Sequence, residues 1–360
     1  MPEILILGGY GNFGKRIAMA LSRQGLPLII AGRDLSKAEA LCRDLPNARP
    51  LRLDIHAGLA EALAAVKPSV VVHTSGPFQG SDYAVARTCI AAGVAYVDLA
   101  DGRDFVRDFD HLDAEAKAAG VTLISGASTV PGLSSAVIEH LKSQFTRMDT
   151  LDFGISPGQK AERGLATTRG ILSYVGKRLR PFTGHPQPYG WQDMYQQTYP
   201  IMGRRYLSTC DIPDLDILPL VYGFQSIRFG AGLELGFMHL GLWGLSWLVR
   251  AGVPLNLPAL AKPLLAISDW FNFIGSDIGG MHVTISGTDP AGAALTRSWF
   301  VVAKSGDGPQ IPCVPAILLA KRLHEKDPTL AYGAFACVGL IQLEDYLNEL
   351  KRFDIETFET

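Results

Sequence analysis

The apolar residues of the first 124 positions fall into short continuous runs, separated by segments whose apolar residues recur at helical spacing. The first run, Ile4–Leu7, is followed by Phe13, Ile17 and Leu21, which are four residues apart. Five further segments are predicted as strands, over residues 27–31, 49–54, 70–72, 95–99 and 121–124. Segments with apolar residues at helical spacing are predicted as helices, over residues 36–45, 59–66, 83–92 and 112–119. Six strands that alternate with helices predict an α/β fold with a doubly wound parallel sheet of the Rossmann type.

The second half of the chain has a different pattern, in which apolar and polar residues alternate. Residues 282–287 and 295–303 alternate around a turn that contains Pro290 and Gly292, which predicts an antiparallel hairpin. The same half predicts a strand over 151–155, a helix over 164–177, an irregular loop over 178–206, and helices over 315–324 and 343–353. The pattern therefore predicts a second, α+β domain that contains an antiparallel sheet.

Residues 229–249 form the most apolar stretch of the chain, with Glu234 as the only acidic residue and no basic one. Its length is close to the roughly 20 residues that span a bilayer. A glutamate is costly inside a membrane, and five glycines weaken a helix. The pattern favours a buried or dimer-interface helix. The wall of a lipid-accepting pocket or a peripheral membrane contact is the second interpretation, and a true span is the third.

Composition excludes several classes of function. The 360 residues are 48% hydrophobic and 19% charged with a formal net charge of −2, so nucleic-acid binding has no electrostatic support. The five cysteines are odd in number and lack C-x-x-C spacing, which favours a reducing compartment such as the cytoplasm over disulfides or a zinc site. The first strand begins near residue 3, so no signal peptide is expected. No metal-ligand spacing, serine–histidine–acid motif or Walker lysine is visible.

The first strand runs directly into the motif G-x-G-x-x-G, which is followed by a helix. In this context the glycines allow a tight turn, a close approach of backbone to a pyrophosphate, and close packing of the helix on the strand. The N-terminus of the helix offers free N–H groups to the phosphates. We therefore predict a dinucleotide site formed by Gly9, Tyr10, Gly11, Asn12, Phe13 and Gly14.

The end of the second strand selects between the two nicotinamide dinucleotides. NAD sites usually have an acidic residue here that binds the ribose 2′-hydroxyl, but this chain has Gly32 followed by Arg33, and its acid, Asp34, comes later. A small residue beside a guanidinium suits the 2′-phosphate of NADP, so NADP is favoured over NAD. The residues predicted at this end of the cofactor are Arg33, Ser36, Lys37 and Asp54.

Polar residues gather where the later strands end, which is where doubly wound sheets bind their ligands. His73, Asp98 and Asp101 are the candidates for a catalytic acid. The alternative is structural: His73 as a buried histidine, Asp98 as the cap of a loop and Asp101 as a solvated acid. The candidates for substrate binding are Arg103, Ser128 and Thr129.

Five segments in this order resemble the saccharopine dehydrogenase-like NADP-binding domain, over about residues 3–142. These segments are Gly8-Gly9-Tyr10-Gly11-Asn12-Phe13-Gly14, Ala31-Gly32-Arg33, Ser75-Gly76-Pro77-Phe78, 92–99 and 118–121. The resemblance implies that Ser75, Gly76 and Pro77 lie near the nicotinamide. Where the family often has threonine, glycine and glutamate, this chain has Ala100-Asp101-Gly102, so the resemblance does not transfer a substrate. The second half is similar to the family's uncharacterised bacterial branch.

The resemblance also implies a domain arrangement and a reaction. Residues 1–130 are expected to form the Rossmann domain, with 310–360 packing back on it, and 131–309 a substrate-binding and dimerisation domain of a homodimer. The implied activity is an NADP-dependent hydride transfer to or from C=O, C=N or C=C. The substrate is then a small molecule or is lipid-like, and the apolar residues 229–249 favour an apolar one. The alternative is a non-catalytic NADP-binding or membrane-associated interaction protein.

Overall fold

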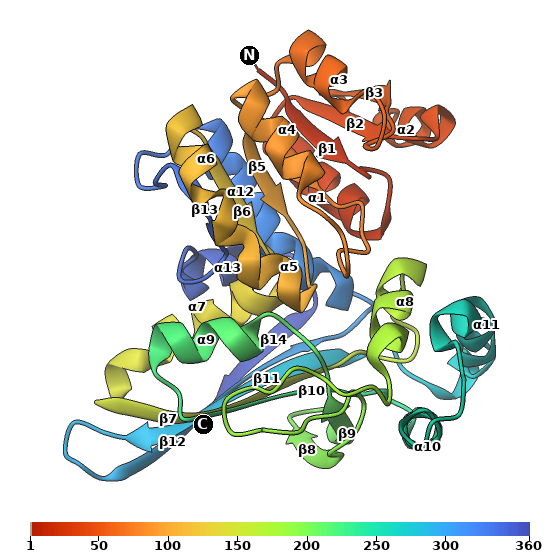
Figure 1. Ribbon diagram of the computed structural model, residues 1–360, viewed down its shortest axis with the longest axis vertical. Coiled ribbons are helices and arrows are strands. Elements are labelled where there is room, and N and C mark those ends of the chain that lie inside the picture. Colours follow the sequence, from red (N-terminus) through yellow and green to blue (C-terminus); the bar gives the residue numbers. More distant parts are fainter. Residues whose placement is uncertain (1) are drawn as a thin grey trace. The chain divides into compact units, whose positions relative to one another are not determined.

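The computed structural model describes residues 2–360, and these form two compact units (Figure 1). The first unit contains the residues up to Leu133 together with Gln310–Ile341. The second unit contains Ser134–Pro309 and Gln342–Thr360. The expectation that 310–360 would pack on the first domain therefore needs a correction for 342–360. These residues lie in the second unit because their last strand extends its sheet.

The first unit alternates strands with helices from its start. Its elements are β1 (Ile4–Leu7), α1 (Asn12–Arg23), β2 (Leu28–Gly32), α2 (Leu35–Cys42), β3 (Ala48–Arg52), α3 (Leu59–Val66), β4 (Val70–His73), α4 (Ala84–Ala92), β5 (Ala95–Asp98), α5 (Arg103–Arg107), η1 (Asp108–Leu112), α6 (Asp113–Ala119), β6 (Thr122–Ser125) and η2 (Thr129–Leu133). After the second unit come η6 (Gly308–Cys313), α12 (Val314–His324) and β13 (Gly333–Ala336).

The seven strands of this unit lie in the order β13-β6-β5-β4-β1-β2-β3, and every pair is parallel. Successive strands move away from β1 in one direction and, starting with β4, in the other. Because such crossovers are right-handed, the helices cover both faces of the sheet. The prediction of a doubly wound parallel sheet is confirmed. The pattern missed β13, whose four residues Gly-Ala-Phe-Ala are too short and too small to stand out as an apolar run.

The second unit is built on a mixed sheet. Its elements are α7 (Ser134–Leu141), η3 (Lys142–Gln144), β7 (Arg147–Ser156), α8 (Leu165–Tyr174), β8 (Tyr195–Tyr199), β9 (Gly203–Thr209), α9 (Asp214–Tyr222), β10 (Ser226–Ala231), α10 (Gly236–Arg250), η4 (Leu257–Leu260), α11 (Ala261–Trp270), η5 (Asn272–Ile274), β11 (Gly279–Thr288), β12 (Ala294–Ala303), α13 (Leu343–Leu350) and β14 (Ile355–Glu359). The strands lie in the order β14-β12-β11-β7-β10-β9-β8, and only β7 and β10 are parallel. The predicted hairpin is β11 with β12.

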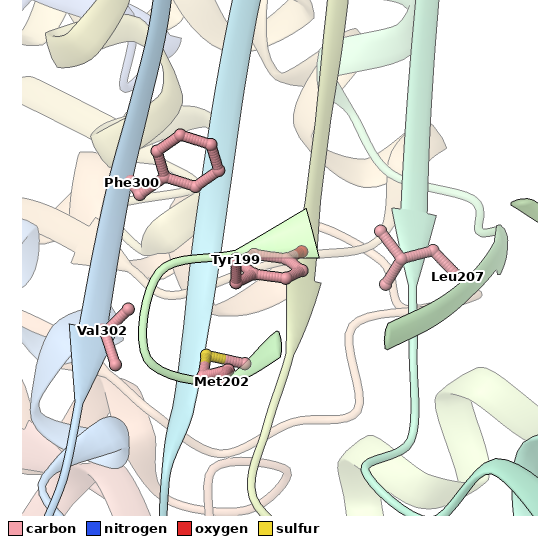
Figure 2. Close-up of a cluster of buried hydrophobic side chains, with 5 residues drawn as sticks. All are labelled: Tyr199, Met202, Leu207, Phe300 and Val302. Atoms are coloured by element: carbon pink, nitrogen blue, oxygen red, sulfur yellow. The ribbon is translucent and has the colours of Figure 1, made fainter. Parts of the chain in front are cut away.

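A cluster of buried side chains holds the β8–β9 hairpin against this sheet (Figure 2). Tyr199 ends β8, Met202 lies in the turn and Leu207 lies on β9, and they pack with Phe300 and Val302 of β12. The Tyr199 hydroxyl also forms a 2.9 Å hydrogen bond with Nδ1 of the fully buried His282 on β11. The prediction of an irregular loop over 178–206 was therefore wrong for this hairpin, because its strands are stabilised by contacts that are distant in sequence.

Residues 229–249 do not form one helix. The chain finishes β10 at Ala231, turns through Glu234 and starts α10 at Gly236. Glu234 fixes this turn because its carboxylate accepts hydrogen bonds from the backbone N–H groups of Gln159 and Ser276, at 2.6 and 3.0 Å. Within residues 2–360 no helix is both long enough and apolar enough to cross a membrane.

Candidate functional site

The glycine-rich turn after β1 is tightly folded, and its glycines lie close to neighbouring backbone and side-chain atoms. Gly8 has a φ of +74°, and the N–H groups of Gly8 and Gly9 both donate to the carbonyl of Ala31, at 2.9 and 3.2 Å. A Cβ on Gly14 would overlap the Gly8 carbonyl oxygen, so only glycine lets α1 begin this close to the turn. The G-x-G-x-x-G motif begins at Gly9, but the residue of the turn with a left-handed backbone conformation is Gly8.

The end of β2 is covered by the ring of Tyr10. A side chain on Gly32 would overlap this ring, and the Tyr10 hydroxyl accepts the backbone N–H of Asp34 at 2.9 Å. Asp34 itself caps α2, because its Oδ1 accepts the N–H of Lys37 at 3.3 Å while Lys37 Nζ lies 3.7 Å from Oδ2. Asp34, the acid that follows β2, therefore interacts with the start of α2.

A cavity of about 480 Å³ opens beside this strand end. Gly32 at the end of β2 is in register with Arg52 at the end of β3, so Arg33 and Arg52 both border the cavity. Arg33, Ser36 and Lys37 are exposed. Asp54 also borders it and accepts the N–H of His56 at 3.0 Å. The complete lining is Arg33, Arg52, Leu53, Asp54, Ala57, Gly58 and Ala62.

Two arginines that border one cavity suit a phosphate monoester, since Arg can bind phosphate oxygens in a bidentate manner. The glycine-rich turn next to the N-terminus of α1 fits a pyrophosphate. The first unit therefore has places for both charged parts of NADP. Sequence reasoning missed Arg52, because β3 reads Ala-Arg-Pro-Leu-Arg and its pairing with β2 is not visible from local pattern.

The turn after β4 touches the glycine-rich turn. A Cβ on Gly8 would lie 2.6 Å from Ser75 Oγ, and Thr74 Oγ1 donates to the carbonyl of Leu7 at 2.8 Å. Gly76 and Pro77 follow as exposed residues joined by a cis peptide bond. The turn that the resemblance placed near the nicotinamide thus borders the predicted pyrophosphate turn.

His73 lies within the core of this unit instead of at its surface. Its ring is 6% exposed, meets Phe78 edge-on at 5.1 Å, and its Nδ1 forms a 3.0 Å hydrogen bond with the Tyr96 hydroxyl. Burial lowers the pKa of His73 to about 4, because the charged ring loses its hydration. A histidine that is neutral at pH 7 and enclosed by aromatic rings is a poor proton donor, which favours the structural interpretation.

Asp98 is fully buried and ties two strand ends together. Its Oδ1 accepts the Ser125 hydroxyl at 2.9 Å and the backbone N–H groups of Gly126 and Ala100 at 2.8 and 2.9 Å. Burial raises the pKa of Asp98 to about 6, while these hydrogen bonds oppose the rise. Asp98 therefore fixes the start of the turn after β6 through buried hydrogen bonds, as expected for a structural role.

Asp101 and Arg103 lie at the start of α5. Asp101 is half-buried, its Oδ1 accepts the Gln79 side-chain amide at 3.0 Å, and burial raises its pKa. Gly102 between them packs directly on the Phe78 carbonyl, which brings this loop to the turn after β4. The Arg103 side chain is 3% exposed. Of the three predicted acids, Asp101 is the one that combines partial exposure with a raised pKa.

Ser128 and Thr129 follow β6, as predicted from their place in the pattern. Ser128 is half-buried, and its backbone N–H donates to Gly126 at 2.8 Å. Thr129 is 9% exposed, so less of its hydroxyl surface is open than that of Ser128. The structure thus leaves Ser128 as the more accessible of the two.

Comparison with known proteins finds one family model and two solved structures to which this chain is similar. Residues 4–124 match the family model described as the saccharopine dehydrogenase NADP binding domain. The whole chain is similar to apo saccharopine dehydrogenase (L-Glu forming) from Saccharomyces cerevisiae, with a TM-score of 0.69, 12% identity and 100% of both chains covered. It is also similar to an amine dehydrogenase from Mycobacterium smegmatis, with a TM-score of 0.50, 14% identity, and 94% and 95% of the two chains covered. At these identities the two structures show a shared fold.

Proposed function

We propose that this chain is an NAD(P)-dependent oxidoreductase that transfers hydride between NADP and a C=O, C=N or C=C bond of a small organic substrate. The proposal is supported by the match of residues 4–124 to the saccharopine dehydrogenase NADP binding domain. The observation that supports this proposal most strongly is the cavity bordered by Arg33 and Arg52 beside the end of β2. It offers two cations to a 2′-phosphate, at a strand end where Tyr10 leaves no room for the acid of an NAD site.

In this proposal each part of the first unit has one role. The glycine-rich turn and the start of α1 bind the pyrophosphate, and Arg33 and Arg52 bind the 2′-phosphate, with Ser36 and Lys37 nearby on α2. Asp54 borders the adenosine part. NADP, when bound, supplies or accepts the hydride.

At the other end of the cofactor site, this chain's residues orient the substrate and hold a proton. Ser75, Gly76 and Pro77 border the nicotinamide in the proposal, and Ser128 offers a hydroxyl to a substrate oxygen. Asp101 is the proposed proton donor: partial burial raises its pKa, and the Gln79 amide holds its Oδ1. Asp98 positions the turn after β6 through its three hydrogen bonds.

Two features of the chain bear on the substrate class. The departure at Ala100-Asp101-Gly102 separates this chain from the family pattern. The large exposed apolar surface of the second unit favours an apolar substrate over one with several carboxylates. We also propose that the second unit binds the substrate and contributes to a homodimer.

The test is a titration of the purified chain with NADPH and NADH, followed by turnover with 2-keto acids, cyclic imines and enoyl thioesters. We expect NADPH to bind at least tenfold more tightly than NADH, and NADPH to be oxidised by one of the three substrate classes. NADPH oxidation by the enoyl thioesters would identify an apolar substrate. Equal affinity for the two cofactors would overturn the assignment of the Arg33–Arg52 cavity.

A further inference from the structure

The second unit exposes an unusual concentration of large apolar side chains over residues 237–274, which we call the apolar face. Sixteen large apolar side chains are strongly exposed among the described residues, and ten of them belong to this stretch of about a tenth of the chain. Isolated exposed apolar residues are ordinary, but a contiguous group marks an interaction site. The ten are Phe237, Leu240, Trp247, Leu248, Val253, Leu260, Ile267, Trp270, Phe273 and Ile274.

The two helices of the apolar face differ from ordinary surface helices, which bury apolar residues and expose polar ones. The fully buried residues of α10 are His239 and Ser246, and His239 Nε2 is hydrogen-bonded to Ser208 at 2.9 Å. The buried residues of helix α11 are Ala261 and Ser268, and the carbonyl and hydroxyl of Ser268 accept hydrogen bonds from the Gln159 amide. Both helices therefore bury polar residues, while four large apolar side chains of α10 and two of α11 are exposed.

Aromatic contacts join the two helices into one surface. The ring of Phe237, at the start of α10, meets Phe271 after α11 at 5.1 Å, and Phe271 meets Trp270 at 6.0 Å. Trp270 and Phe273 are 77% and 76% exposed, so they protrude from this cluster. Figure 1 shows α8, α10 and α11 grouped together in the second unit. The apolar face is thus a single surface with aromatic rings projecting from it.

Basic residues are in excess in the segment that packs against the apolar face, although the chain as a whole has a formal net charge of −2. Residues 158–178 contain five basic residues and one acidic residue, and their helix α8 packs against α11 and η4. Residues 236–277 are balanced, with two basic and two acidic residues. The guanidinium of Arg250 lies over the rings of Tyr189 and Trp247, at 4.0 and 4.9 Å. The exposed basic residues of these two segments, which we call the basic rim, are Lys160, Arg169, Lys177, Arg178, Arg250 and Lys262.

We propose that the apolar face docks this protein on an anionic lipid surface. Projecting Trp and Phe side chains beside Lys and Arg are the combination that binds the boundary between headgroups and acyl chains, where Trp is enriched. The basic residues supply electrostatic attraction to anionic headgroups. Helices α10 and α11, of 15 and 10 residues, lie in the plane of the interface in this arrangement. The proposal rests on the second unit alone and is independent of the proposed cofactor.

The charge pattern favours a lipid surface over a second copy of the chain. A self-complementary interface would bring the same basic rim of both copies together, and like charges oppose such an association. An anionic bilayer instead neutralises the rim while it covers the aromatic rings.

The tryptophans allow a direct test with the unmodified chain. Trp191 and Trp299 are 1% and 3% exposed, whereas the two exposed tryptophans, Trp247 and Trp270, both belong to the apolar face. Vesicles of phosphatidylcholine with 30% phosphatidylglycerol, prepared with brominated acyl chains, should quench Trp fluorescence and co-sediment with the protein. Vesicles of phosphatidylcholine alone should bind at least about fivefold more weakly, because the basic rim loses its partner.

A double variant, Trp270→Ser with Phe273→Ser, tests the surface itself. Both side chains are more than three-quarters exposed, so the fold should tolerate the change. We expect vesicle binding to fall at least about tenfold, since two aromatic side chains no longer leave water. The matched control is Leu220→Ser with Val221→Ser on α9, which are 84% and 56% exposed and should leave binding unchanged.

Two outcomes would overturn the proposal. One is that the unmodified protein neither sediments with the anionic vesicles nor shows quenching. The other is that the double variant converts a dimer into a monomer by sedimentation velocity while vesicle binding is absent, which would make the apolar face an interface between two copies. NADPH affinity, measured on the same samples, reports separately on the first unit.

Discussion

The hydroxyl of Tyr10 accepts a hydrogen bond from the backbone N–H of Asp34 at 2.9 Å, and the ring of Tyr10 lies over Gly32. This relationship links the glycine-rich turn to the end of β2. It explains why the strand ends in glycine: any side chain at position 32 would overlap the ring. It also explains why the nearby acid is unavailable to a ribose, since Asp34 caps α2 through Lys37.

Replacing Gly32 with aspartate should therefore fail to create an NAD site. The new side chain would displace the Tyr10 ring, so we expect Gly32→Asp to weaken NADPH binding without improving NADH binding. Adding Tyr10→Ser gives the carboxylate room, and the double variant should bind NADH more tightly than Gly32→Asp alone. Fluorescence titration of both variants measures this, and a gain of NADH affinity in the single variant would contradict the role of Tyr10.

Replacing either arginine of the cavity should weaken the binding of NADPH and leave the binding of NADH nearly unchanged. Arg33→Ala or Arg52→Ala removes a charge-assisted hydrogen bond to the 2′-phosphate, worth about 1.5–3 kcal/mol, so the Kd for NADPH should rise about 10- to 150-fold. The Kd for NADH should change by less than about threefold, because NADH lacks this phosphate. Arg43→Ala, at the exposed end of α2 and outside the cavity lining, is the matched control. An equal loss for both cofactors would refute the assignment.

Asp101 should affect turnover without affecting cofactor binding. If it donates the proton, Asp101→Asn lowers kcat by about 10²- to 10⁴-fold and leaves the Kd for NADPH unchanged. Because burial raises the pKa of Asp101, its acid form persists to higher pH, and the rate of reduction should fall above that pKa. The variant should lose this alkaline limb. Asp104→Asn, one turn away at an exposed side chain, is the control, and an unchanged kcat in Asp101→Asn would exclude the role.

Asp214 should make the protein less stable as the pH rises. It is fully buried at the start of α9, where it accepts the Ser134 hydroxyl, and burial raises its pKa from 3.8 to about 7. The folded state therefore holds this proton while the unfolded state releases it, so the free energy of unfolding falls between about pH 4 and pH 7.

Asp214→Asn should remove this dependence of the free energy of unfolding on pH. At pH 8 its free energy of unfolding should exceed that of the unmodified protein by on the order of 2–4 kcal/mol, with no difference at pH 4. His73 and His239, whose pKa values are lowered to about 4 by burial, change stability in the opposite direction but do so equally in both proteins. Denaturant unfolding at the two pH values measures the difference. A variant that is no more stable than the parent at pH 8 would contradict the account.

The sequence predicted the first unit well because its signals are local. A continuous apolar run, a glycine-rich turn and helical spacing all appear within about 20 residues, and β1 with α1 was recognised from these alone. The exact turn residue was not, because the motif does not reveal that Gly8 rather than Gly9 takes the positive φ. Arg52 was missed because it reaches the cavity only through the register of β3 with β2.

The second unit was less predictable because its elements are fixed by distant contacts. β8 and β9 have no strong alternation, and they are held by Phe300 and Val302 about 100 residues later. Residues 229–249 are apolar throughout, so the pattern could not show where β10 ends and α10 begins. The pattern showed that this stretch is unusual, and the structure adds that four of its large apolar side chains, Phe237, Leu240, Trp247 and Leu248, are exposed.

The most direct test of the central claim uses fragments of the cofactor. Adenosine 2′,5′-bisphosphate carries the 2′-phosphate, whereas adenosine 5′-diphosphate lacks it, and neither contains nicotinamide. Isothermal titration of the unmodified protein should show the bisphosphate binding at least about tenfold more tightly, with this advantage lost in Arg33→Ala with Arg52→Ala. Equal affinity for the two nucleotides would contradict the assignment of this cavity to the 2′-phosphate of NADP.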